Sequence, residues 1–139
     1  MSSKREQIMA AIMAKLTPAG LGATVYRSRK EAVDRAEGNV AILEWVTDQA
    51  TQNFHTFTEW RLSIAVTVFV RADAPDTAAD PVVVEIHKRI MSDRTLGGLC
   101  QDIEAQVSSL DIVSADKESA VLTNSFDIMY RTSQEDISV

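Results

Sequence analysis

Residues able to do acid–base, nucleophilic or metal chemistry are few and scattered in this chain. His55 and His87 are remote from each other, and no H-x-x-x-H, C-x-x-C or clustered carboxylate pattern accompanies either of them. We expect His55 in a hairpin loop and His87 beside the apolar stripe of a helix, each as an ordinary histidine. Cys100 has no motif partner, which is typical of a small buried side chain rather than a nucleophile. The sequence therefore indicates no catalytic set, no metal site and no cofactor.

The one adjacent pair of glycines lies in Leu96-Gly97-Gly98-Leu99. It lacks the spacing of a phosphate-binding loop or a dinucleotide fingerprint. We expect a helix C-cap followed by a tight turn, because glycine tolerates positive φ.

Two groups of side chains are candidates for binding a partner. The first is basic and is interleaved with acids; its members are Arg27, Arg29, Lys30 and Arg35. A solvated loop is its default interpretation, and a subunit or nucleic-acid contact is the alternative. The second is aromatic and surrounds an expected hairpin; its members are Trp45, Phe54, Phe57 and Trp60. Core packing is its default interpretation, and oligomerisation through an uncovered strand edge is the alternative.

Length and composition limit the class of protein to which these two groups of side chains belong. At 139 residues the chain predicts one domain, with a core large enough to need neither disulfides nor a metal. Fourteen bases against 20 acids give a net charge of −6, which argues against a general binder of nucleic acid or anionic membrane. Apolar runs are too short for a membrane-spanning helix, so we expect a soluble intracellular domain.

Periodicity places these residues on secondary structure. Ser3 and Glu6 form a capping-box pattern before a helix over residues 4–16, which Thr17-Pro18 ends. A short strand at 23–27 leads into the charged segment 28–38, which is a loop or a marginal surface helix. A strand at 40–46 precedes polar residues 47–53, which we interpret as a connection. Strict alternation over residues 60–70 predicts a long strand that pairs with 40–46 in a hairpin, with loop residues near 48–55.

The second half of the chain begins with Asp80-Pro81, a pattern that favours a helix start. Apolar spacing continues this helix to about Ser92-Asp93, with Glu85 and Arg89 paired on its outer side. Two strands are predicted near residues 103–113 and 120–132, joined by a turn at 115–118. Asn124 interrupts the apolar face of the last strand, which suggests a bulge there, and residues 133–139 are expected to form a frayed tail.

These elements predict a single α+β domain spanning residues 1–139. Two helices pack on one face of a mostly antiparallel sheet of about four to five strands that includes a long β-hairpin. The face opposite the helices has a mixed composition that suits solvent or a partner.

The whole-chain layout resembles the tail terminator proteins of long-tailed bacteriophages, the minor tail protein U family of phages and prophages. The resemblance covers nearly the full chain. It is carried by the order of the elements and by short segments: Val25-Tyr26-Arg27-Ser28-Arg29, the strands 40–46 and 60–71, Leu96-Gly97-Gly98-Leu99 followed by Asp102 and Glu104, and Tyr130-Arg131-Thr132.

The resemblance implies a structural role without catalytic residues. Such proteins form hexameric rings on the head-proximal end of the tail tube, stop tube polymerisation and present a surface to head completion proteins. It implies a location in the virion tail, and in the host bacterial cytoplasm during assembly. The candidate interfaces are then the basic segment and the hairpin tip with Phe54 and Phe57. DNA would pass through the ring without specific binding, and the isolated subunit could be a monomer until the tube templates its assembly.

Two other interpretations stay open at this point. One is a different head–tail component, such as a connector or stopper of similar size. The other is a small-molecule-binding or enzymatic α+β domain, which would need convergent polar residues in a cleft.

Overall fold

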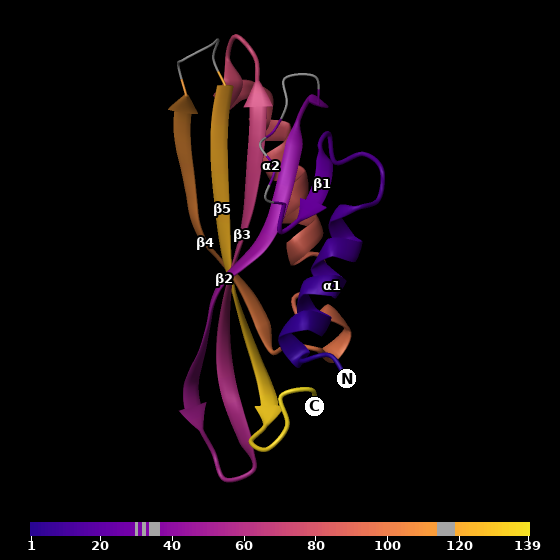
Figure 1. The fold of residues 1–139 in the computed structure, drawn as a ribbon, viewed down its shortest axis with the longest axis vertical. Coiled ribbons are helices and arrows are strands. Elements are labelled where there is room, and N and C mark those ends of the chain that lie inside the picture. Colours follow the sequence, from indigo (N-terminus) through magenta and orange to yellow (C-terminus); the bar gives the residue numbers. More distant parts are fainter. Residues whose placement is uncertain (30, 32, 34–36, 114–118) are drawn as a thin grey trace.

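A five-stranded sheet with both helices against one face forms the framework (Figure 1). A computed structural model describes residues 1–29, 31, 33, 37–113 and 119–139. The strands are β1 (Thr24–Arg27), β2 (Val40–Asn53), β3 (Phe57–Arg71), β4 (Asp102–Val113) and β5 (Ser119–Ser133). Their order in the sheet is β1-β2-β3-β5-β4, with a parallel β1–β2 pair and antiparallel pairing elsewhere. The predicted fold class is therefore confirmed.

Helix α1 (Lys4–Leu16) has the bounds that the sequence predicts. The Ser3 hydroxyl accepts a hydrogen bond from the Glu6 amide at 3.2 Å, which caps the first turn. The helix buries one stripe, formed by Ile8, Met9, Ile12 and Leu16. After a loop, the run at 23–27 forms the short strand β1 (Thr24–Arg27), as expected, and β1 pairs in parallel with the start of β2.

The hairpin is longer than predicted. Strand β2 (Val40–Asn53) contains the polar residues 47–53 that we interpreted as a connection, and β3 (Phe57–Arg71) also extends beyond the predicted 60–70. The loop therefore covers only residues 54–56 and not 48–55. Most of residues 47–53 are exposed, so they carry no apolar alternation, and their pairing with β3 identifies them as strand. In Figure 1 this hairpin, together with the end of β5, projects beyond the helices.

Helix α2 (Pro75–Met91) starts earlier than the predicted Asp80-Pro81. Pro75 occupies the first turn, where its missing N–H costs nothing, and Ala79 already contributes to the buried stripe. Pro81 lies inside the helix, where it removes one backbone hydrogen bond on the exposed side. The predicted pair of Glu85 and Arg89 is present at 2.9 Å.

The glycine pair forms the expected tight turn, but the expected helix C-cap is wrong, because α2 already ends with Ser92 as its C-cap. It belongs to a 3₁₀ turn, η2 (Leu96–Gly98), in which Gly97 has φ 71° and Gly98 has φ 97°. The Asp93 carboxylate accepts hydrogen bonds from the amides of Thr95 at 3.1 Å and Gly97 at 2.9 Å, which fixes the turn.

Strands β4 (Asp102–Val113) and β5 (Ser119–Ser133) match the two predicted strands closely. The expected bulge lies on β4 and not at Asn124 of β5, because Gln106 and Val107 together oppose one residue of β5. Asn124 remains in register, where its side chain bonds the Ser108 hydroxyl and the Val66 carbonyl. The predicted turn at 115–118 lies outside the described residues, as do residues 30, 32 and 34–36 of the segment 28–38.

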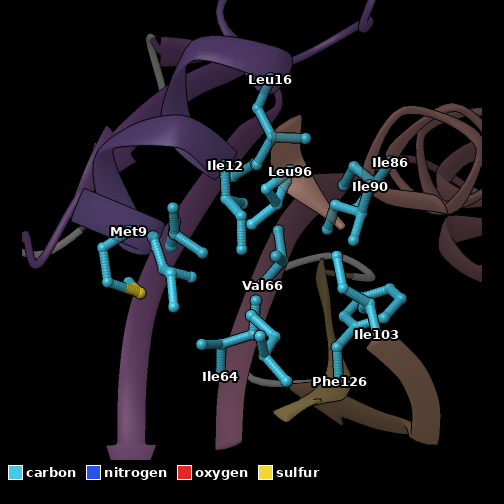
Figure 2. Packing of buried hydrophobic residues seen from close by; sticks show 14 of the residues in the cluster. Met9, Ile12, Leu16, Ile64, Val66, Ile86, Ile90, Leu96, Ile103 and Phe126 are labelled. Carbon is cyan, nitrogen blue, oxygen red and sulfur yellow. The ribbon is translucent and has the colours of Figure 1, made fainter. Parts of the chain in front are cut away.

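The core fills the space between the helices and the sheet. Figure 2 shows Met9, Ile12 and Leu16 of α1 and Ile86 and Ile90 of α2 directed toward the same layer of side chains. That layer comes from alternate positions of the sheet, including Ile64, Val66, Ile103 and Phe126, all of which are buried. The alternation predicted for residues 60–70 thus identifies the face of β3 that the helices cover.

The last residues connect the chain ends to the hairpin. We expected them to fray, whereas the structure has the Ile137 carbonyl accepting from the Lys4 amide at 2.7 Å. Gln7 donates to the Ser138 carbonyl at 3.1 Å, and Gln134 donates to the Phe54 carbonyl. The C-terminal segment therefore bridges the start of α1 and the hairpin tip.

Arg89 of α2 joins the two helices and contributes to the stability of the fold. Its guanidinium donates to the carbonyls of Leu16 at 3.2 Å, Pro18 at 2.7 Å and Ala19 at 3.0 Å, which satisfies the end of α1. We expect Arg89→Lys to lower the free energy of unfolding by about 2 kcal/mol, because one ammonium cannot replace this fork of donors.

Chemical denaturation would measure that change. Its matched control is Lys88→Ala on the exposed neighbour, which should stay within about 0.5 kcal/mol of the parent. Equal stability of Arg89→Lys and the parent protein would contradict the bridging role.

Candidate interaction surfaces

The two described members of the basic segment, Arg27 and Arg29, each pair with a carboxylate of the same subunit. Arg27 of β1 makes a bidentate contact with Glu6 of α1, at 2.7 and 2.5 Å. These two hydrogen bonds lower the pKa of the Glu6 carboxyl and raise the pKa of the Arg27 guanidinium, because they favour the charged form of each group. This pair fastens β1 to α1 and leaves little net positive charge at Arg27.

Arg29 is held in the same way. It makes a bidentate contact with Glu37 at 2.7 and 2.8 Å, and its guanidinium lies 4.6 Å from the centre of the Tyr26 ring. Lys30 and Arg35 lie outside the described residues. The structure therefore brings Arg27 and Arg29 to the β1 side of the sheet, each engaged by a carboxylate.

The hairpin tip carries an aromatic pair, as the sequence suggested. Phe54 and Phe57 stack with ring centres 4.4 Å apart, and the Arg131 guanidinium lies 4.7 Å from the centre of the Phe57 ring. Both phenylalanines are half-buried, and His55 is exposed in the loop between them. Aromatic side chains at the end of a projecting hairpin give a preformed contact surface with little side-chain entropy to lose.

Where the hairpin leaves the body, a polar network lies among aromatic rings. The Tyr130 hydroxyl donates to Asp48 Oδ2 at 2.6 Å, and Arg5 approaches the same oxygen at 3.4 Å. Arg5 also lies 4.4 Å from the centre of the Trp45 ring. The sequence pointed to Trp45 but not to Arg5, Asp48 or Tyr130. These three come from α1, β2 and β5, and no local pattern in the sequence connects them.

A second feature that the sequence did not reveal is the outer margin of β4. Several large apolar side chains are exposed there or on the adjacent face of α2: Val84, Val107, Leu110 and Ile112. A groove of about 390 Å³ runs between α2 and β4, and His87 lies on its wall with its ring 6.0 Å from that of Phe126. Because β4 ends the sheet, its outer backbone groups have no ladder partner in the sheet as described.

The sheet face opposite the helices has a mixed composition, with an apolar part at Ile42, Phe69 and Val121 and many charged residues elsewhere. The register places these charged residues there: Glu44, Glu59, Arg61, Arg71, Asp102, Glu104, Asp111, Asp127 and Arg131. Arg61 pairs with Asp127 at 2.8 Å, and Arg131 pairs with Glu59 at 3.3 Å. The remaining acids outnumber the remaining base, so this face carries a net negative charge.

Residues with catalytic potential do not converge. His55 and His87 lie on different elements, the hairpin loop and α2. Cys100 is buried, and burial raises the pKa of its thiol to about 11, so it is a poor nucleophile at neutral pH. Among residues with a described position, no group of His, Cys, Asp and Glu could hold a metal ion. No described helix is long and apolar enough to cross a membrane.

Comparison with known proteins agrees with a structural role. A search of curated proteins finds no match. One solved structure has a TM-score of 0.53 at 15% sequence identity, covering 92% of this chain and 96% of the other, which supports the fold alone. The family model for phage minor tail protein U matches residues 3–130. Because this match spans nearly the whole chain, the protein belongs to the phage minor tail protein U family, a component of phage tail assembly.

Proposed function

We propose that this protein is a tail terminator, which closes the head-proximal end of a phage tail tube as a ring. In this role it stops tube polymerisation and presents a surface to the head completion protein. Membership of the minor tail protein U family is the observation that carries the proposal. The projecting aromatic hairpin and the uncovered margin of β4 support it, because a ring subunit needs surfaces for its neighbours and for the tube.

The acidic sheet face fits the passage of DNA through the ring. In the proposed arrangement this face lines the channel, where Glu44, Glu104 and Asp111 repel the phosphate backbone. The three basic residues of the face are spread along it, and two of them form ion pairs with its acids. DNA would then slide past the subunits without being retained. The ring is expected to be hexameric, as the resemblance to tail terminators implies.

Electron microscopy tests the proposal directly. The protein would be imaged alone and after mixing with tubes assembled from the cognate tail tube protein. In the mixed sample we expect a ring, seen as added density, at one end of each tube and no further tube growth. Free subunits without rings in both samples, together with bare tube ends, would remove the terminator function. Rings that bind only the head completion protein would favour a connector or stopper instead.

A charge exchange tests whether Arg27 contacts a neighbouring subunit. Arg27→Glu alone breaks the internal pair with Glu6, whereas Arg27→Glu combined with Glu6→Arg keeps the pair and reverses its direction. If Arg27 lies at the interface, the double variant should fold normally and assemble about tenfold more weakly. Analytical ultracentrifugation measures assembly, and thermal unfolding measures the fold. Full assembly by the double variant would assign Arg27 an internal role only.

Removing the aromatic pair tests the hairpin tip. Phe54→Ser with Phe57→Ser eliminates the stacked surface and should weaken binding to tube ends by tenfold or more, or about 1.4 kcal/mol. We expect a loss of folding stability of only about 1 kcal/mol, because both rings are half-buried and far from the core. His55→Ala, between them, is the matched control and should bind normally. Unchanged binding by the double variant would exclude the tip as the tube contact.

A further inference from the structure

Asp48 is a buried carboxylate within an otherwise exposed, polar stretch of strand. Its side chain is only 7% exposed, whereas its neighbours on β2, Thr47 and Gln49, are exposed. One oxygen accepts from Tyr130, and no hydrogen bond reaches the other oxygen from any residue that the structure describes. Burying a partly satisfied carboxylate costs stability, so its position calls for another explanation.

The location of Asp48 supplies that explanation. Strand β2 has two bulges, with Val46 and Thr51 as the extra residues, and Asp48 lies between them. Bulges bend and twist a strand, so pairing with β3 alone leaves the course of β2 weakly fixed here. β1 pairs only with residues 40–43 of β2 and gives no support at this point.

Three separate elements meet at the Asp48 side chain. Arg5 comes from α1 and Tyr130 from β5, on the far side of β3. Burial and the adjacent carboxylate raise the pKa of Tyr130 above its ordinary value, so its hydroxyl remains a donor near neutral pH. Tyr130 in turn stacks on Trp60 at 6.2 Å, and the Trp60 indole donates to the Thr132 hydroxyl at 2.9 Å.

We propose that Asp48 is a positioning residue that fixes the direction in which the hairpin projects from the body. Its hydrogen bond to Tyr130 and its pairing with Arg5 tie the bulged strand to β5 and α1. The aromatic tip at Phe54 and Phe57 is thereby presented in one orientation for docking. This inference rests on the proposed function only for what the tip contacts, because the direction of the hairpin is a property of the single subunit.

Distance measurement between spin labels tests the inference. Labels at His55→Cys on the tip and Lys88→Cys on α2 occupy exposed sites, and buried Cys100 resists labelling. Labelled protein is diluted with unlabelled protein so that only distances within one subunit contribute. We expect one narrow distance distribution for the parent and a shifted or broadened one for Asp48→Ala and Tyr130→Phe. Gln49→Ala, on the exposed neighbour, should leave the distribution unchanged.

The outcomes separate positioning from a purely structural role. A lower melting temperature with an unchanged distance distribution in both variants would overturn the inference. A broadened distribution in variants that still bind tube ends normally would support Asp48 as the residue that directs the hairpin, and would contradict only the need for one orientation of the tip in docking. Tyr130→Phe keeps the ring and its stacking, so it remains a valid test if Asp48→Ala does not fold. If the parent protein itself fails to bind tube ends, the proposed function is wrong, while the distances still decide whether Asp48 directs the hairpin.

Discussion

The uninterrupted ladder between β3 and β5 is the constraint on which the rest of the molecule depends. It runs in constant register from Phe57–Ser133 to Arg71–Ser119, so one pair of strands serves both the core and the projecting hairpin. Its upper part carries the apolar side chains that the helices cover, and its lower part carries the hairpin beyond them. The flanking strands β2 and β4 both contain bulges, so adjustments of shape are made at the margins and not in this central pair.

Charged residues have different roles on the two faces of the sheet. On the helix side, charged groups act as fasteners: Arg27 holds β1 to α1 through Glu6, and Arg89 of α2 satisfies the end of α1. On the opposite face, charged groups remain accessible and are mostly acidic. Pairing does not change the net charge of −6, but it engages several arginines in holding elements together, and the unpaired excess on the opposite face is acidic.

The sequence predicts those elements in which one face is buried, because burial of one face gives the apolar residues a regular spacing along the chain. Alternation over residues 60–70 located β3, and the apolar stripe with its cap located α1, because each side chain must face the core or solvent. The sequence did not predict residues 47–53 as strand because most of their own side chains are exposed, so no apolar alternation marks them, and only pairing with β3 makes them a strand. The aromatic tip could be anticipated from residue type. Asp48 could not, because its importance arises from partners on α1 and β5 that no local pattern connects.

The margin of β4 combines features that favour association with features that restrain it. Leu110 and Ile112 are exposed on one side of an unpaired edge, which by itself would invite uncontrolled pairing between copies. The bulge at Gln106 and Val107 interrupts that edge, and Glu104 and Asp111 place like charges along it, so two copies of β4 oppose each other poorly. Under the proposed function, such an edge keeps the association between subunits weak until another surface holds the neighbours in place. That surface is the end of the tube, so a ring forms more readily on a tube than in free solution.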